Sequence, residues 1–296
     1  MVTCAHTLAA HSSYVVGVAC AEDIAISGSW DCTLKVWDIE SGREIRTLMG
    51  HNDRVRGVAL IDNCHVVSCS DDKTLNIWDF RTGKKQHDAV NLTSLNYRHY
   101  IIGQHMTTLK GHPGKVRCVT ATSDGKWIIS GAEDKLVGVW HAQEPFGLKH
   151  FMEGHTSWVE AVATSPVDDL IASCANDGDC TVKLWSLHDG VCLKTLTGHK
   201  RIVYALAFGL QGDYLVSCSL DKTIRVWSTI NGNQLARLTY DDQLDALCLF
   251  PWKESTLLAV GEHSGLLSLL QPIWPVAQVG EKRTEQTPKK KVSRWD

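Results

Sequence analysis

The stretch LVSCSLDKTIRVWS, residues 215–228, decides the fold of this chain. It contains an apolar run with small residues, a short polar turn around Asp221, and a second alternating run that ends at Trp227. Alternating apolar positions rich in Val, Ile and Thr predict strands, and the polar interruption predicts a hairpin turn. Four other versions of this line occur at residues 24–38, 66–79, 128–141 and 171–186.

A Gly-His pair followed by a short apolar run precedes four of these lines, and Ala10-His11 stands in the same place before the first. Between Trp185 and Trp227 the interval is 42 residues. A period of ~40–45 residues with four strands in each unit resembles the WD-repeat (beta-transducin-like) family. The resemblance extends over residues 3–270 and implies an all-β propeller, because a four-stranded blade cannot bury both of its faces alone.

The resemblance also implies a buried polar network in each blade. In the family, a His, a strand Ser, a turn Asp and a Trp bond to one another and hold three strands together. In the fourth unit two extra residues leave Asp177 and Asp179 competing for the Asp place. Because the pattern recurs five times, it indicates a framework and not a catalytic triad. The sets carried over are His11, Ser27, Asp31 and Trp37; His51, Ser68, Asp72 and Trp78; His112, Ser130, Asp134 and Trp140; His155, Ser173 and Trp185; and His199, Ser217, Asp221 and Trp227.

The sixth unit, residues 240–270, has the strand pattern without the network. No further outer strand follows it, whereas residues 4–11 resemble the outer strand that precedes each later Gly-His pair. We therefore predict six blades, five regular and one degenerate, with the N-terminal strand completing the last blade and removing its open edge. The alternative is a seven-bladed ring or an incomplete seven-bladed ring.

The predicted propeller domain covers residues 1–276 and carries an insertion at residues 80–110. If residues 83–90 are the outer strand of the second blade, the insertion lies on the face of the Asp turns. If residues 105–109 are that strand, it lies on the opposite face. Both alternatives stay open at this point. Residues 277–296 are polar and charged, and we predict a disordered basic tail.

Composition excludes several classes of protein. The formal net charge of −3 argues against general binding of nucleic acid. The 11 cysteines include no C-x-x-C pair, which indicates reduced thiols in an intracellular protein, cytoplasmic or nuclear. No apolar run is long enough to cross a membrane. There is no Gly-rich phosphate loop, H-E-x-x-H or G-x-S-x-G, so we predict no catalytic residues, cofactor or metal.

In the family, partners most often bind the face that carries the Asp turns. Cations on two adjacent blades, flanked by Trp residues, predict docking of an acidic or phosphorylated segment there. The alternative is that Asp71 and Glu133 neutralise the arginines. The predicted protein-binding residues are Tyr14, Trp30, Arg54, Arg56, Lys115, Arg117, Trp158 and Tyr204.

The predicted function is therefore that of a non-enzymatic scaffold or adaptor in a multi-protein complex. One alternative is a substrate-recognition subunit of a ubiquitin ligase, because the first two blades resemble the propellers of F-box proteins, although no F-box helix is present. The other is a spliceosome or RNA-processing component. Residues 289–296 are similar to the tryptophan ligand motifs of splicing factors, with Arg294, Trp295 and Asp296 as the contacts, and residues 288–292 resemble part of a nuclear-import signal.

Overall fold

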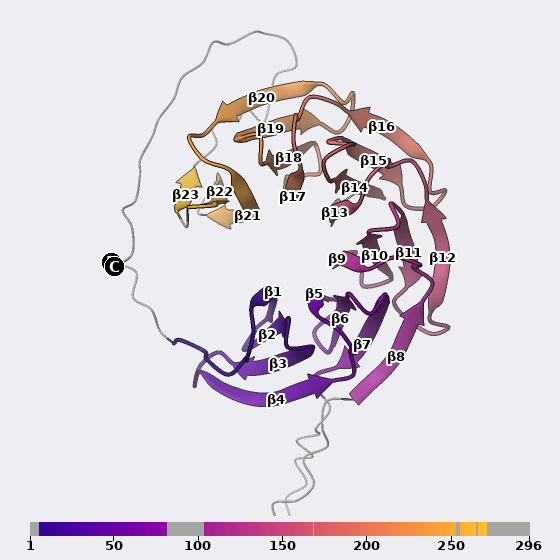
Figure 1. The fold of residues 1–296 in the computed structure, drawn as a ribbon, viewed down its shortest axis with the longest axis vertical. Coiled ribbons are helices and arrows are strands. Elements are labelled where there is room, and N and C mark those ends of the chain that lie inside the picture. Colours follow the sequence, from indigo (N-terminus) through magenta and orange to yellow (C-terminus); the bar gives the residue numbers. More distant parts are fainter. Residues whose placement is uncertain (1–5, 82–103, 168, 253–254, 265, 271–296) are drawn as a thin grey trace, which may run out of the picture.

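The computed structural model describes residues 6–81, 104–167, 169–252, 255–264 and 266–270. These residues form 23 β-strands in six antiparallel sheets, which follow one another around a ring as the blades of a propeller (Figure 1). Within the described ranges, no helix is long and apolar enough to cross a membrane. The predicted six-bladed all-β propeller is confirmed.

Each blade runs outward from an inner strand. Blade 1 consists of β1 (Val15–Ala21), β2 (Ile24–Ser29), β3 (Thr33–Asp38) and β4 (Arg43–Met49). Blade 2 consists of β5 (Val55–Leu60), β6 (His65–Ser70), β7 (Thr74–Asp79) and β8 (Gln104–Lys110). Blade 3 consists of β9 (Val116–Ala121), β10 (Trp127–Ala132), β11 (Val137–His141) and β12 (Gly147–Met152).

The later blades repeat this order. Blade 4 consists of β13 (Val159–Thr164), β14 (Leu170–Ala175), β15 (Val182–Ser186) and β16 (Cys192–Leu196). Blade 5 consists of β17 (Val203–Phe208), β18 (Tyr214–Ser219), β19 (Thr223–Ser228) and β20 (Gln234–Thr239). Blade 6 has three strands within the described residues, β21 (Leu244–Trp252), β22 (Ser255–Glu262) and β23 (Leu267–Leu270).

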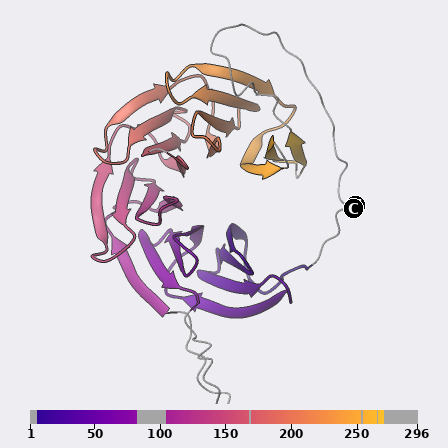
Figure 2. The same ribbon diagram turned by 180° about the vertical axis from the view of Figure 1, so that it is seen from behind.

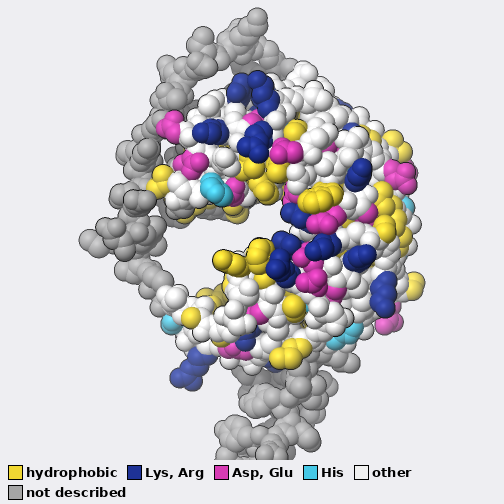
Figure 3. All heavy atoms as spheres, in the orientation of Figure 1, with side chains coloured by type: hydrophobic (Ala, Val, Ile, Leu, Met, Phe, Trp, Pro, Cys, Tyr) yellow, Lys and Arg dark blue, Asp and Glu magenta, His cyan; other side chains and the backbone are white. Residues whose placement is uncertain are grey.

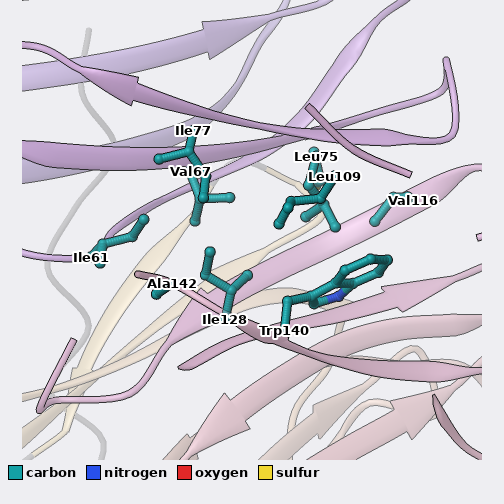
Figure 4. Packing of buried hydrophobic residues seen from close by; sticks show 10 residues of the cluster. Ile61, Val67, Leu75, Ile77, Leu109, Val116, Ile128, Trp140 and Ala142 are labelled. Atoms are coloured by element: carbon teal, nitrogen blue, oxygen red, sulfur yellow. The ribbon is translucent and has the colours of Figure 1, made fainter. Parts of the chain in front are cut away.

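The core lies between successive blades. Leu75 and Leu109 of blade 2 pack against Ile128 and Trp140 of blade 3, and Figure 4 shows these side chains pointing toward one another. Because successive side chains of a strand point to opposite faces, each sheet contacts the preceding blade with one face and the following blade with the other. The middle strands therefore bury apolar side chains on both faces.

The blades approach one another closely at a glycine. A Cβ atom added to Gly131 of β10 would lie 2.5 Å from Cγ1 of Val159 in blade 4 and 2.6 Å from Sγ of Cys118. These separations are shorter than carbon and sulfur atoms tolerate, so only glycine lets blade 4 pack here.

The structure decides between the two alternatives for the insertion. Residues 105–109 lie in β8, which pairs with β7 as the outer strand of blade 2. The connection between β7 and β8 therefore leaves and re-enters blade 2 on the face opposite the Asp turns. Residues 82–103 themselves lie outside the described part of the chain.

The N-terminus differs from the prediction. Residues 6–14 form no strand, and β23 has no fourth strand beside it among the described residues. The His6 ring instead bonds through Nε2 to the carbonyl oxygen of Glu40, at 2.9 Å, which holds this segment against its own blade. The ring stays open between β23 and blade 1 in both views (Figures 1 and 2).

Candidate protein-interaction face

A hydrogen-bonded network of four side chains lies inside each of the first five blades. The Nδ1 atom of the His lies 2.7–3.0 Å from an Asp oxygen. The Nε2 atom lies 2.7–2.8 Å from the Ser hydroxyl. The same hydroxyl accepts the Trp indole N–H at 2.7–2.9 Å. In blade 4, Asp179 holds His155, and Asp177 does not.

The carboxylates fix the tautomer of each His. An ionised carboxylate only accepts hydrogen bonds, so Nδ1–H donates to the Asp and Nε2 accepts the Ser proton. Burial raises the pKa of Asp31, but hydrogen bonds from Thr33, His11 and the backbone outweigh burial and lower it to about 2. Burial likewise raises the pKa of Asp221, but hydrogen bonds from His199 and Thr223 outweigh burial and hold this pKa well below its usual range.

The Asp turns also set the spacing of residues on the face above them. In each of the first five blades, one residue just before the inner strand accepts, through its carbonyl oxygen, the backbone N–H of the residue before the turn. The pairs are Tyr14 with Trp30, Arg54 with Asp71, Lys115 with Glu133, Trp158 with Asn176, and Ile202 with Leu220, at 2.9–3.0 Å. The two side chains of each pair therefore lie next to one another at the inner edge of this face.

We call the set Tyr14, Trp30, Arg54, Arg56, Lys115, Arg117, Trp158 and Tyr204 the rim. Figure 3 shows basic and acidic side chains interspersed around the inner edge of this face, with hydrophobic side chains beside them. The structure brings the first seven into two groups, one on blades 1–3 and one on blades 3 and 4.

The first group is organised by Asp71, whose side chain is 1% exposed. Arg56 donates two parallel hydrogen bonds to it, Nε to Oδ1 and Nη2 to Oδ2, both 2.8 Å long. Lys115 Nζ lies 3.4 Å from the same Oδ2. Burial raises the pKa of Asp71, but the hydrogen bond and charge of Arg56 dominate and lower it. Two cations therefore share one buried carboxylate.

Trp30 connects this group to blade 1. The Arg54 guanidinium lies 4.6 Å from the Trp30 ring centroid and that of Arg56 lies 5.1 Å from it. Tyr14 meets Trp30 edge to face at 5.1 Å. Arg54 is exposed and forms no ion pair with any of the described carboxylates, so its charge faces solvent above the indole.

The second group is organised by Arg117. Its Nη1 atom lies 2.9 Å from Glu133 and its Nε atom lies 2.9 Å from Glu160. Asn176 donates to the other oxygen of Glu160. Burial lowers the pKa of Arg117, but Glu160 and Glu133 outweigh it and raise the pKa. Trp158 covers the guanidinium at 5.4 Å and is itself 44% exposed.

Glu160 is the partner of Arg117 that the sequence pattern did not predict. It occupies the fifth place after His155, and Arg117 occupies the fifth place after His112. Because equivalent positions on neighbouring blades lie side by side, this shared spacing was the sequence feature that could have predicted the ion pair between Arg117 and Glu160. Tyr204 is half-buried, and burial, with Glu160 next in effect, raises its pKa.

The comparisons with known proteins agree with this geometry. The family described as "WD domain, G-beta repeat" matches residues 2–38, 42–79, 103–141, 146–186 and 190–228. The chain belongs to the WD-repeat family. The five matched repeats are the five units that carry the His-Asp-Ser-Trp network.

Several curated fungal WD-repeat relatives are similar to this chain. It is 31% identical to the nuclear distribution protein PAC1-2 of Uncinocarpus reesii, over 76% of this chain and 53% of that protein. It is 32% identical to the nuclear distribution protein nudF of Emericella nidulans, over 78% of this chain and 63% of that protein. The chain therefore spans between about half and two thirds of the length of these relatives.

As a WD-repeat propeller, the chain uses its recurrent His, Ser and Asp side chains inside the blades, where they bond to one another. No group of three or more His, Cys, Asp or Glu side chains in the described residues is arranged to hold a metal ion. The chemistry that the rim presents outward is cationic and aromatic. The tail residues Arg294, Trp295 and Asp296 lie outside the described residues.

Proposed function

We propose that this chain is a non-enzymatic protein-interaction scaffold that binds an acidic or phosphorylated segment of a partner at the rim. Arg54 is the observation that carries the proposal. Of the four rim cations, it alone has no carboxylate partner among the described residues. A guanidinium held over an indole is ready to donate a forked pair of hydrogen bonds to a carboxylate or phosphate.

Lys115 is the second cation that an acidic segment can use. Its side chain is 43% exposed, and its 3.4 Å separation from Asp71 is longer than that of Arg56. Because Arg56 already neutralises Asp71 with two short bonds, Lys115 can turn to a ligand without leaving a buried charge unpaired. Arg56 and Arg117 then act as braces that hold the rim in place.

Exposed aromatic side chains supply the apolar part of the site. Tyr14 is 72% exposed, and Trp158 is 44% exposed on the other side of the cations. Large, rigid aromatic rings contribute contact area at little cost in conformational entropy, and they are frequent among the residues that dominate binding energy. A segment with acidic groups flanked by apolar residues fits this order of side chains.

A peptide array tests the proposal. Acidic and phosphoserine peptides, with uncharged counterparts, would be screened against the chain, and the best binder measured by fluorescence anisotropy. We expect Arg54→Glu to weaken binding about tenfold or more, with a loss of affinity in high salt, because it reverses an exposed contact charge. Arg43→Glu is the matched control, since Arg43 is exposed at the start of β4. Equal affinities for the two variants, or no charged binder at all, would reject the site.

The name of the relatives suggests where in the cell this scaffold acts and in which kind of complex. PAC1-2 and nudF are both named nuclear distribution proteins. We include in the proposal a cytoplasmic or nuclear location and a part in a complex that distributes nuclei. Depletion of the chain should then disturb nuclear spacing, which imaging measures. The ubiquitin-ligase and RNA-processing alternatives stay predictions, because neither an F-box helix nor the tail motif lies in the described residues.

A further inference from the structure

Blade 1 exposes a face that every following blade buries. Val15 of β1 is 49% exposed, and Val18 is 62% exposed. Ile39, after β3, is 42% exposed, whereas Phe80 at the same place in blade 2 is 2% exposed. The residues in the place of Val15 on later inner strands are all 0% exposed; they are Val55, Val116, Val159, Val203 and Leu244.

The network tryptophans show the same asymmetry. Trp78, Trp140, Trp185 and Trp227 each belong to an apolar cluster that includes side chains of the preceding blade. Trp37 is 5% exposed and belongs to none of these clusters. Among the described residues, no preceding blade packs against Trp37 as one does against each of the other four network tryptophans.

Blade 6 exposes the complementary face. Leu267 and Leu269 of β23 are 52% and 45% exposed. The same places on β19 hold Ile224 and Val226, which are 0% and 2% exposed because blade 6 covers them. A Cβ atom on Gly261 would meet only Ala246 of its own blade, whereas one on Gly131 would strike blade 4.

These two faces border the opening in the ring. Each inner strand packs beside the next, from β1 and β5 through to β17 and β21, but β21 and β1 do not pack in this way. The ribbons leave a gap between β23 and blade 1 from both sides (Figures 1 and 2), and the described side chains do not fill it when drawn as spheres (Figure 3). Exposed apolar faces of this kind mark docking sites.

We propose that the opening is the docking site for a seventh blade, a β-sheet supplied by a partner protein. The five interfaces within this chain define the chemistry of that sheet. Toward Leu267 and Leu269 it presents a Trp or similar ring with a β-branched residue, as blades 2 to 5 do toward their neighbours. Toward Trp37 and Val15 it presents aliphatic side chains.

A partner sheet can cover both faces at once, and this favours it over a second copy of the chain. A second copy of this chain meets one face with its own end of the ring and leaves the other face bare. The partner sheet also continues an arrangement that already repeats five times. This surface adjoins the rim at Tyr14, next to Val15, but it shares no residue with the rim, so the inference does not depend on how the rim functions.

Two exposed thiols report on the two faces. Cys20 lies on the exposed face of β1, and Cys248 lies on the open side of β21, beside Ala246 of the same face. Cys64 is also exposed but lies between β5 and β6, away from the opening, and Cys69 is buried. Alkylation by iodoacetamide, followed by mass spectrometry of the peptides, measures all four in one experiment.

The test compares the purified full chain with tagged chain isolated in native complexes from cells that express it. In the purified chain, Cys20 and Cys248 should react at about the rate of Cys64. In the complexes, both should be protected about tenfold or more while Cys64 is unchanged. Val18→Asp and Leu269→Asp should each remove the protection, and Arg54→Glu should leave it intact.

Four results would overturn the inference. Protection of both thiols in the dilute purified chain would show that the ring closes on itself. Protection that grows with the concentration of the purified chain would identify a second copy as the occupant. Full reactivity in the complexes would show that nothing docks there. A photo-crosslinker at position 269 checks the occupant, which must be a strand of another protein; a crosslink to this chain's own sequence contradicts the proposal.

Discussion

Asp179 Oδ2 lies 3.0 Å from Nδ1 of His155, whereas the nearby Asp177 accepts the backbone N–H of Ile202 in the next blade. The two extra residues of the fourth repeat therefore lengthen its turn without displacing its network. Asp179 completes the polar chain inside blade 4, and Asp177 links two blades at the surface.

This pair gives the first prediction. Asp179→Ala should lower the free energy of unfolding by about 2–4 kcal/mol, because it leaves the buried His155 with an unmet donor. Asp177→Ala should cost about 1 kcal/mol or less, since Asp177 is exposed to water. Urea denaturation followed by tryptophan fluorescence measures both. Similar losses for the two variants would contradict the assignment.

The second prediction separates bracing from binding on the rim. Arg56→Ala removes both hydrogen bonds to Asp71, which is buried, and should destabilise the fold by about 1–3 kcal/mol. Arg54→Ala should change stability by less than about 0.5 kcal/mol, because Arg54 is exposed and unpaired with any described carboxylate. Thermal unfolding of the two variants checks this order, and the reverse order would show that Arg54 is the brace.

The third prediction uses two glycines at equivalent places. Gly131→Ala should cost about 1–3 kcal/mol, because the new methyl group strikes Val159 of the next blade. Gly261→Ala should cost less than about 0.5 kcal/mol in the purified chain, since only Ala246, at 3.3 Å, lies near. Denaturation curves again provide the measurement. A large loss for Gly261→Ala would mean that another blade already packs there.

The fourth prediction concerns acid. The pKa of Asp31 is lowered to about 2 and that of Asp221 is lowered further, so their stabilisation is complete above their unfolded pKa of about 3.9 and is lost as the pH falls toward the folded values. Burial lowers the pKa of His199, with Asp221 opposing, so its neutral form adds stability that is lost as the pH falls below its unfolded value of about 6.5.

We therefore expect the urea concentration at the midpoint of unfolding to decrease slightly as the pH is lowered from about 6.5 to 5, and steeply below about pH 4. Asp221→Asn should flatten the lower part of this profile, because the replaced group no longer titrates. Urea midpoints measured at a series of pH values provide the check. An unchanged acid slope in the variant would exclude Asp221 as a source of acid sensitivity.

The repeats made most of the fold predictable. Each repeat contains its own strand alternation and its own polar set, so the local pattern specified both the blade and its interior. The closure of the ring was different. Residues 4–11 resemble an outer strand, yet pairing with blade 6 is a long-range event, and the bond from His6 to Glu40 competes locally for that segment.

The rim was predictable by position but not by pairing. Repeat spacing placed Arg117 and Glu133 on one face, whereas the ion pair with Glu160 joins two blades and depends on the angle between them. The insertion illustrates the same limit. Both candidate outer strands fitted the pattern, and only the observed pairing of β7 with β8 decides between them.

Each His-Asp-Ser-Trp set makes its side-chain bonds within a single blade, while neighbouring blades meet mainly through aliphatic and indole surfaces. A blade can therefore be gained or lost in evolution without breaking the His-Asp-Ser-Trp network of any other blade. The polar network specifies the structure of each blade but does not set the number of blades. Propellers of unequal blade number can accordingly descend from one another by simple duplication or deletion.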